Sequence, residues 1–219
     1  MKRRDMEKKD AVIIFGASAL GKAALEIFES NGMVAYGFLD DTKALHGTEI
    51  NNVTVLGTTD DDTYLKLIGA SCDAFIASDE PKLREGLTNM LHERRQTQAV
   101  NAIHSSASIS DSASIGHGNF INASAIVGAN AEVGSHCLIH TGAIIDFEAV
   151  IEDFVQIGAG AIINAGAKIE KGAFIGTGAI IIGGIVVGKN ARVGAGSVVI
   201  APVKDKETVF GNPAVAMKS

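Results

Sequence analysis

The stretch IHTGAIIDFEAVIEDFVQIGAGAII, residues 139–163, places an isoleucine at every sixth position. The same period, filled by Ile or Val without exception, runs from Ile103 to Val199. An amphipathic helix needs apolar residues at intervals of three and four, and a half-buried strand needs them at every second position, so a period of six fits neither. It is typical of a solenoid, in which each repeat packs against its neighbours.

The repeat also carries a small residue four positions after nearly every one of these anchors, as in Ala113, Ala143 and Ala173. A branched and a small residue that point inward at fixed offsets predict a narrow triangular coil, with three short strands and three hexads per turn. The anchors from residue 103 to residue 199 then give a little over five coils. Glycines directly after the anchor, such as Gly158, are expected at tight corners where a side chain would clash or φ is positive.

The first hundred residues have a different pattern, in which apolar runs of strand length alternate with helical segments. The expected elements are strands at 11–15, 34–39, 53–56, 72–78 and 98–103, a turn at 16–21, and helices at 22–31, 60–68 and 81–95. This alternation predicts a small Rossmann-like parallel sheet, so we expect an α/β domain over residues 1–102 and an all-β coil over residues 103–219. The tail after Val199 breaks the period and is expected to fold back as a cap.

Composition narrows the possible classes of function. The chain has 219 residues, of which 47% are hydrophobic and 20% charged, as in an ordinary soluble protein. Its net charge of −6, with no basic stripe interleaved with aromatic residues, argues against a nucleic-acid partner. The apolar run at 11–15 is too short for a signal sequence or a membrane span, so a cytoplasmic protein without membrane insertion is predicted. Cys72 and Cys137 have no zinc-binding spacing and are expected to be buried thiols.

The segment Gly16–Gly21 lies between the first predicted strand and the first predicted helix. Backbone N–H groups and the helix dipole can hold a phosphate at such a turn. Ser18 replaces the middle glycine of the dinucleotide fingerprint, and the second strand ends at the pair Asp40-Asp41 instead of a single acidic residue. A nucleotide-diphosphate group therefore fits this turn better than a full dinucleotide, and a tight turn without a ligand is the alternative.

Six histidines are candidates for metal binding or proton transfer. Two are expected at the plain surface, His46 and His92, and four fall in the coil, His104, His117, His136 and His140. His104 and His140 lie two coils apart on one face, but no third histidine completes a zinc site between subunits, so no metal is predicted. His140 follows an anchor in the middle coils and is the candidate base, because imidazole titrates near neutral pH. The alternative is an exposed histidine without a role.

The chain resembles, over its whole length, the bacterial sugar acetyltransferases of the sialic acid O-acetyltransferase and UDP-4-amino-sugar N-acetyltransferase kind. The segments that carry the resemblance are IIFGAS at 13–18, FLDD at 38–41, KLR at 82–84, the hexads, and VFGNPA at 209–214. The resemblance implies a small Rossmann-like nucleotide-binding domain followed by a left-handed parallel β-helix of hexapeptide repeats. It also implies a homotrimer that uses acetyl-CoA as co-substrate.

The same resemblance implies two groups of site residues. Those expected beside the nucleotide sugar are Gly16, Ser18, Ala19, Leu20, Asp40, Asp41 and Asp79, and those expected beside the CoA arm, between neighbouring subunits, are Gln156, Ala165, Thr177 and Ala195.

Several positions depart from the family pattern. Ala19 and Leu20 replace a Gly-His pair, Asp79 replaces a glycine, and Gln156 replaces a histidine that contacts acetyl-CoA. Phe147 stands where the family has its catalytic histidine, although the acidic neighbour is kept as Glu148. An imidazole is present instead at His140, where the family has asparagine.

The predicted function is therefore an acetyl-CoA-dependent acetyltransferase that acts on an amino or hydroxyl group of a nucleotide-linked or related sugar. In this prediction His140 takes the proton of the acceptor and Glu148 orients or stabilises the imidazole. An amine acceptor that binds in its neutral form needs little help from a base. The alternative is a catalytically silent trimeric scaffold or nucleotide-binding protein, because several functional positions have changed together.

Overall fold

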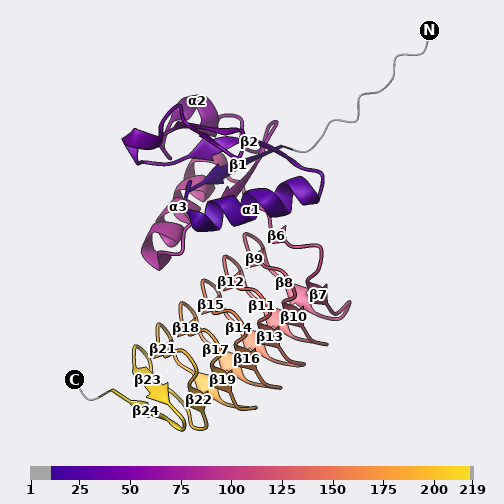
Figure 1. The fold of residues 1–219 in the computed structure, drawn as a ribbon, viewed down its shortest axis with the longest axis vertical. Helices are drawn as coiled ribbons and strands as arrows, with labels where there is room; N and C mark the ends of the chain where they lie inside the picture. Colours follow the sequence, from indigo (N-terminus) through magenta and orange to yellow (C-terminus); the bar gives the residue numbers. More distant parts are fainter. Residues whose placement is uncertain (1–10, 218–219) are drawn as a thin grey trace. The chain divides into compact units, whose positions relative to one another are not determined.

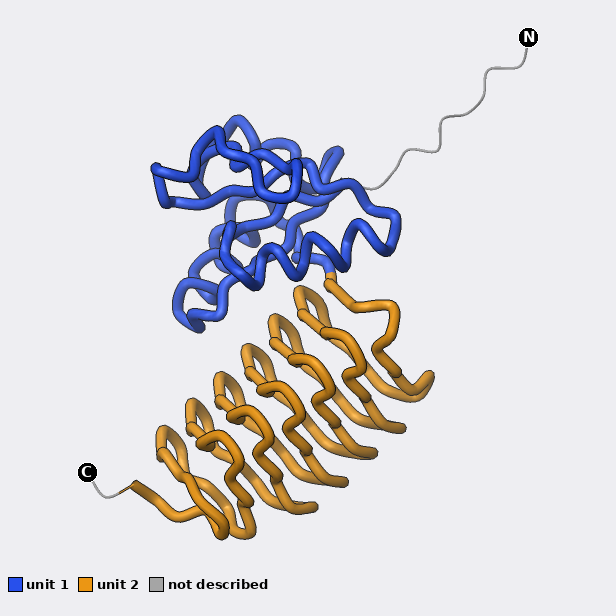
Figure 2. The backbone as a smooth tube through the Cα atoms, in the orientation of Figure 1, with its two compact units in different colours: residues 1–100 blue, residues 101–219 orange. Residues whose placement is uncertain are grey.

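The structure, a computed structural model, describes residues 11–217. The chain forms two compact units, residues 1–100 and residues 101–219 (Figure 2). Each unit has a hydrophobic core of its own.

Unit 1, drawn in indigo to magenta in Figure 1, is built on a five-stranded sheet. The strand order is β3-β4-β2-β1-β5. Its strands are β1 (Ala11–Phe15), β2 (Val34–Leu39), β3 (Glu49–Ile50), β4 (Val53–Gly57) and β5 (Asp73–Ile76). Four of these strands run parallel, and the edge strand β3 is antiparallel to β4. The helices are α1 (Ala19–Ser30), α2 (Asp62–Leu65) and α3 (Pro81–Arg95), with a short 3-10 helix η1 at Lys43–Leu45.

Local chemistry explains where the elements of unit 1 begin. The interior strand β1 is an unbroken apolar run that is buried from its second residue onward, as expected for a parallel strand covered on both faces. Helix α1 begins three residues earlier than predicted because Ser18 caps it, with its Oγ accepting a hydrogen bond from the backbone N–H of Gly21. Helix α3 begins at Pro81, whose fixed φ and missing N–H suit a first helical turn.

Three sequence-based expectations for unit 1 are wrong in detail. The helix expected near 60–68 is only the single turn α2, because the chain turns back at Gly69 (φ 77°) before it enters β5. The strand expected at 98–103 is reduced to β6 (Ala102–Ile103), which pairs with the coil of unit 2 and not with the sheet. The edge strand β3 was not expected, because its two residues are too few to produce a sequence pattern.

Unit 2 is a parallel β-helix whose short strands stack into three faces (Figure 1). Face 1 consists of β6 (Ala102–Ile103), β9 (Phe120–Ile121), β12 (Leu138–Ile139), β15 (Gln156–Ile157), β18 (Phe174–Ile175), β21 (Arg192–Val193), β23 (Thr208–Gly211) and β24 (Ala214–Ala216). Face 2 consists of β7 (Ser108–Ile109), β10 (Ile126–Val127), β13 (Ile144–Ile145), β16 (Ile162–Ile163), β19 (Ile180–Ile181) and β22 (Val198–Val199). Face 3 consists of β8 (Ser114–Ile115), β11 (Glu132–Val133), β14 (Val150–Ile151), β17 (Lys168–Ile169) and β20 (Val186–Val187).

The anchors of the six-residue period fill the core of unit 2. Ile139, Ile145 and Ile151 come in turn from faces 1, 2 and 3, and all three are buried. Successive coils pair in register eighteen residues apart, so that Ile139 lies beside Ile157. The prediction of three hexads per turn, with a branched and a small residue inside each, is therefore confirmed.

The corners of the coil have two backbone requirements at different positions. The left-handed conformation occurs three residues after an anchor, as at Gly142 (φ 66°), Glu148 (φ 56°) and Phe154 (φ 61°). The glycines directly after an anchor do not have positive φ. They are needed because the next coil lies too close: a Cβ on Gly158 would be 2.5 Å from the backbone nitrogen of Thr177. Of the two reasons predicted for these glycines, only the steric one holds.

The period continues beyond the last predicted anchor after a shortened corner. Val203 forms a bridge with Val187, and β23 pairs with β21 in parallel, which extends the stack with a register of sixteen residues in place of eighteen. Only β24 turns back, as an antiparallel strand on β23. The expected cap is therefore real but begins later than Val199.

A ladder of polar side chains runs inside the first coils of face 1. Asn119 is fully buried, and its Nδ2 donates to the backbone O of Gly134 (2.9 Å) while its Oδ1 accepts from the backbone N of Cys137 (2.7 Å). One coil earlier, Asn101 accepts a bond from the backbone N of Asn119 in the same way (2.8 Å). These amides satisfy backbone groups that the coil leaves without a partner.

We expect Asn119→Ala to lower the free energy of unfolding by about 2 kcal/mol or more, because it leaves the N–H of Cys137 and the carbonyl of Gly134 buried without partners. Asn122→Ala is the matched control, since Asn122 donates to Thr141 at the exposed corner (2.9 Å) and its loss should cost about 0.5 kcal/mol. Urea unfolding of both variants tests this difference, and equal losses would contradict it.

Candidate functional site

A cavity of about 290 Å³ opens in unit 1 where β1, β2, β4 and β5 end. It is lined by Phe15, Gly16, Ser18, Asp40, Asp41, Thr42, Thr59, Ala77, Ser78, Asp79, Glu80, Leu83 and Leu87. In an open parallel sheet, ligands bind at the carboxyl ends of the strands, so the topology makes this cavity the candidate binding site of unit 1.

Asp40 connects two of the loops that line the cavity. Its Oδ2 accepts a hydrogen bond from the backbone N of Ala17 (2.8 Å) and its Oδ1 accepts one from the backbone N of Thr42 (2.9 Å). Partial burial alone would raise the pKa of Asp40, but these hydrogen bonds, with a contribution from His46, outweigh it and hold the pKa below the usual carboxyl value. Asp40 therefore stays ionised and fixes the turn after β1 against the end of β2.

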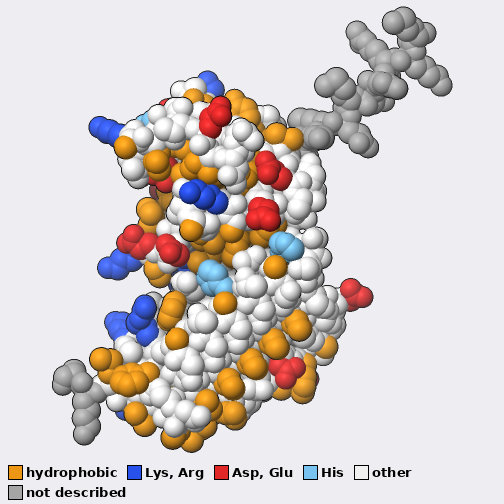
Figure 3. Space-filling view, in the orientation of Figure 1, with side chains coloured by type: hydrophobic (Ala, Val, Ile, Leu, Met, Phe, Trp, Pro, Cys, Tyr) orange, Lys and Arg blue, Asp and Glu red, His pale blue; other side chains and the backbone are white. Residues whose placement is uncertain are grey.

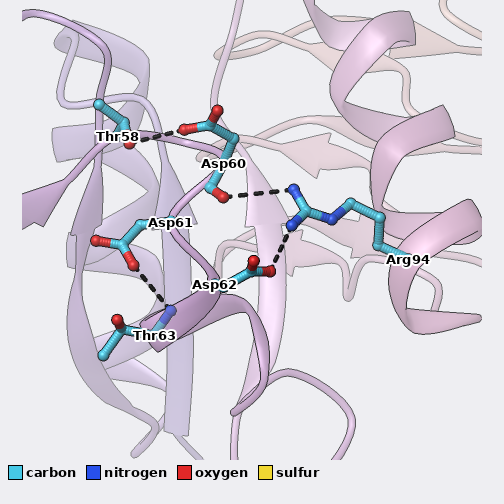
Figure 4. A network of polar contacts seen from close by, with 6 residues as sticks. All are labelled: Thr58, Asp60, Asp61, Asp62, Thr63 and Arg94. Carbon is cyan, nitrogen blue, oxygen red and sulfur yellow. Dashed lines mark hydrogen bonds and ion pairs between the residues drawn. The ribbon is translucent and has the colours of Figure 1, made fainter.

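Asp41 ties a second loop to the same end of β2. Its Oδ1 accepts hydrogen bonds from the backbone N (2.8 Å) and the Oγ1 (3.0 Å) of Thr59. Two residues after Thr59, Asp61 accepts a bond from the backbone N of Thr63 (2.8 Å) and caps α2 (Figure 4). Arg94 of α3 reaches the carbonyl of Asp60 and the carboxylate of Asp62, so the loop is also held from the other side (Figure 4).

The turn after β1 has no room for a side chain at Gly16. A Cβ there would be 2.6 Å from the carbonyl oxygen of Ala77, and φ is 111°. Ser18 both caps α1 and places its Oγ 3.3 Å from the same carbonyl. The loop at Gly16–Ser18 is thus held in place at the N-terminus of α1. The backbone N–H groups in the first turn of that helix have no partner within the helix.

Five of the seven residues predicted for the nucleotide sugar lie together in this cavity: Gly16, Ser18, Asp40, Asp41 and Asp79. Leu20 is buried and Ala19 is exposed, and neither lines the cavity. Sequence reasoning missed Thr42, Thr59, Ser78 and Glu80. All four follow the carboxyl ends of parallel strands, and that rule would have identified them.

On unit 2, His140 and Gln156 lie side by side on face 1. The Nε2 atoms of the two side chains are 3.3 Å apart, and the ring of Phe120 lies 6.0 Å from that of His140. With the Gln156 amide as donor, the neutral ring of His140 accepts at Nε2. The structure therefore brings the predicted base into contact with one residue predicted for the cofactor.

The other predicted residues of unit 2 lie at two corners of the coil. Phe147 and Glu148 lie at the corner between faces 2 and 3, and Ala165 lies at the same corner one coil further on. The two coils are joined there by a hydrogen bond from the backbone N of Gly166 to the backbone O of Phe147 (3.2 Å). Phe147 is 52% exposed.

The remaining two residues, Thr177 and Ala195, occupy successive levels of the corner between faces 1 and 2, and both are exposed. In the coil that contains β12, the first residue of this corner is His140. Within the described part of one chain, Glu148 makes no hydrogen bond or ion pair with His140, because the two residues belong to different corners.

No group of three or more His, Cys, Asp or Glu side chains within residues 11–217 is placed to hold a metal ion. His117 and His136 stack edge to face at 5.0 Å, and burial lowers the pKa of His117, with a smaller opposing effect from Asp153. No helix in the described part of the chain has the length and hydropathy needed to cross a membrane.

Two families match the sequence. Residues 11–91 match the PglD N-terminal domain, and residues 166–201 match the bacterial transferase hexapeptide family (six repeats). No curated protein matches the chain.

Solved structures match almost the whole chain. A variant of perosamine N-acetyltransferase from Caulobacter crescentus, solved with CoA and GDP-perosamine, is 27% identical and has a TM-score of 0.87, over 95% of this chain and 97% of that chain. The acetyltransferase domain of PglB from Neisseria gonorrhoeae, solved with acetyl coenzyme A, is 27% identical with a TM-score of 0.86, over 95% and 100% of the two chains. WeeI from Acinetobacter baumannii is also 27% identical, with a TM-score of 0.84 over 95% and 100%.

The fold and these matches define a hexapeptide-repeat acyltransferase. More narrowly, the chain has a PglD-type N-terminal domain and hexapeptide repeats, and over 95% of its length it is similar to bacterial sugar acetyltransferases. The resemblance found in the sequence is thereby confirmed, as is the fold class, a Rossmann-like domain followed by a left-handed parallel β-helix.

We expect Asp40→Asn to weaken nucleotide binding about tenfold and to lower the free energy of unfolding at pH 7 by about 1 kcal/mol, because an amide cannot accept both backbone bonds. Since the pKa of Asp40 is lowered in the folded state, its contribution is present above the usual carboxyl pKa and is lost as the pH falls through the folded value. The stability difference between wild type and variant should therefore shrink in acid. Unfolding at pH 7 and pH 3 measures it, with Asp111→Asn, an exposed aspartate, as control.

Proposed function

We propose that this protein transfers the acetyl group of acetyl-CoA to the amino group of a nucleotide-linked sugar. The observation that carries the proposal is the likeness, over 95% of the chain, to an N-acetyltransferase solved with CoA and a GDP-linked sugar. The cavity of unit 1 supports it, because it combines a glycine turn and a helix N-terminus with carboxylates that suit ribose hydroxyls. A cytoplasmic location belongs to the same proposal, since acetyl-CoA and sugar nucleotides are supplied there.

The reaction requires little from the protein apart from positioning. A neutral amine attacks the thioester carbonyl, the C–N bond forms, the C–S bond breaks, and the proton lost by nitrogen ends on the CoA thiolate. A base that accepts this proton during attack contributes about 10²- to 10⁴-fold. An amine needs such help less than a hydroxyl does, which favours N-acetylation in a chain with Phe147 at the family's histidine position.

His140 is the base in this proposal. The contact with Gln156 is suited to that role, because a carboxamide can donate to the neutral ring through Nε2 and, after rotation, accept from the charged ring through Oε1. Gln156 thus stabilises both protonation states of His140 while it remains near the predicted path of the CoA arm.

His140→Asn is expected to lower kcat about 100-fold with little change in KM, and to remove the acidic limb of the pH–rate profile. His92→Gln is the control, because His92 is exposed on α3 of unit 1. The measurement is acetyl-CoA turnover with UDP-, dTDP- and GDP-linked amino sugars. Full activity of the His140 variant at every pH would remove His140 from the mechanism. Absence of transfer by the wild type with every acceptor would favour the silent scaffold.

A homotrimer is part of the same proposal, and face 2 supports it. In five of the six strands on this face, β10, β13, β16, β19 and β22, the outward position is a branched apolar residue. These residues stack in register over five coils: Ile126, Ile144, Ile162, Ile180 and Val198. Figure 3 shows a row of hydrophobic side chains over the strands that Figure 1 labels β10, β13, β16, β19 and β22. Face 3 has a mixed outward column that includes Glu132 and Lys168.

Packing of subunits through face 2 would also complete the acetyl-transfer site. His140 lies at one edge of this face and Glu148 at the other, so the two edges meet when face 2 of one chain packs against a neighbour in a cyclic arrangement. Glu148 of one subunit can then approach His140 of the next, which is not possible within one chain.

Ile162→Asp should convert the trimer into a species with the 22.7 kDa mass of the single chain, because the new carboxylate would be buried in the middle of the apolar column. Val186→Asp on face 3 is the matched control and should leave the assembly unchanged, since Val186 is an exposed outward residue beside Lys168. Sedimentation velocity distinguishes the species. A wild-type protein that sediments as a monomer would refute both the trimer and the shared site.

A further inference from the structure

The cavity of unit 1 is acidic. Four carboxylates line it, from Asp40, Asp41, Asp79 and Glu80, and none of its described lining residues is Lys or Arg. A diphosphate would be repelled by most of this wall. The one region suited to it is the turn at Gly16–Ser18 with the amides of the first turn of α1. The carboxylates must therefore face the ribose and the base.

Two of the four carboxylates already have partners in the protein. Asp40 accepts the backbone N–H groups of Ala17 and Thr42, and Asp41 accepts the backbone N–H and the hydroxyl of Thr59. Both lie at the end of β2, the position from which an acidic side chain meets a ribose in this kind of sheet. Asp40 and Asp41 fix the loops and can also accept hydrogen bonds from the ribose hydroxyls.

The other two carboxylates lie on the loop after β5 and are exposed, without a hydrogen-bond donor from the described residues. The loop itself is held firmly. Arg84 is fully buried and donates from Nη1 to the carbonyl O of Ser78 (2.7 Å), and the Ser78 Oγ accepts from the backbone N of Glu80 (3.2 Å). Asp79 lies between these two fixed residues and is therefore presented to the cavity from a rigid backbone.

An apolar surface lies beside the same loop. Leu83, in the first turn of α3, is 45% exposed although it lines the cavity together with Leu87 and Phe15. An apolar wall next to a fixed carboxylate is the arrangement that a flat heterocyclic base needs, with its face on the hydrocarbon and its polar edge on the charge.

The polar edges of the bases differ in what they offer a carboxylate. Guanine presents two adjacent donors, N1–H and the N2 amino group, which match the two oxygens of a carboxylate in a bidentate contact. Uracil and thymine present a single N–H between two carbonyl oxygens, which a carboxylate would repel. Adenine and cytosine present one amino group beside a ring nitrogen that is an acceptor.

We propose that the nucleotide of the sugar substrate is a guanosine diphosphate, and that the carboxylate of Asp79 reads the N1–H and N2 amino group of its base. The proposal rests on the proposed function, in which this cavity holds the nucleotide. It adds the class of nucleotide and a residue that determines specificity. Asp79 is assigned in preference to Glu80 because both its neighbours in the loop are fixed by hydrogen bonds from or to Ser78.

Calorimetric titration of the full chain with GDP, IDP, UDP and dTDP tests the inference. GDP should bind at least tenfold more tightly than UDP or dTDP. IDP, which keeps N1–H but lacks the N2 amino group, should bind about tenfold more weakly than GDP. Equal binding of all four would overturn the inference and leave the proposed function standing. If none of the four binds, the nucleotide cavity of the proposed function is itself wrong.

Asp79→Asn gives the residue-level test. The variant should bind GDP at least tenfold more weakly and lose the difference between GDP and IDP. Its affinity for UDP should stay the same or rise, since a negative charge has been removed near an anionic ligand. Glu93→Gln, which removes an exposed charge of α3 outside the cavity, controls for that general effect. An Asp79 variant with the wild-type ratio of GDP to IDP affinity, or a loss of that ratio in Glu80→Gln alone, would overturn the assignment of Asp79.

Discussion

The backbone register between coils is the constraint on which unit 2 depends. Each strand pairs with the strand eighteen residues further on, as Ile144 does with Ile162, and most backbone N–H groups of the coil bond in these pairs or at the corners. An inserted residue would shift every later side chain to a different direction, which explains why the period survives without interruption from residue 103 to residue 199. The single change, sixteen residues in place of eighteen before Val209, falls at a corner near the end of the stack.

The same register decides which side chains meet on the surface. Residues eighteen apart stack directly, which turns one outward position per coil into the continuous apolar column of face 2. Residues sixteen apart meet diagonally across neighbouring strands, and His140 and Gln156 have that spacing. The chemistry of the coil is therefore set by its period, because no loop of variable length is needed to bring these two side chains together.

The sequence predicted the coil closely because one residue type at one interval determines it. Unit 1 was predicted less completely. Its central strands and α3 are clear from apolar runs and Pro81, but β3 is only two residues long and α2 is a single turn. For the cavity, the sequence identified residues adjacent to the glycine turn and the Asp pair. It did not identify Thr59 or Ser78, because neither residue belongs to a motif of its own. Both follow the carboxyl ends of parallel strands, and only that general rule about where ligands bind would have pointed to them.

The register also limits where a histidine can compensate for the phenylalanine at position 147. A histidine cannot be restored at that corner by a shift of the chain, since Glu148 must keep the left-handed backbone (φ 56°) and the carbonyl of Phe147 is bonded to the next coil. A replacement imidazole has to be at another outward position, and in the proposed trimer the positions that border face 2 are the ones that a neighbouring subunit reaches. His140 is such a position, and its partner Gln156 replaces a second histidine of the family pattern. In the proposed trimer, the changes at 140, 147 and 156 belong to one site between chains, so they are one rearrangement and not three separate losses.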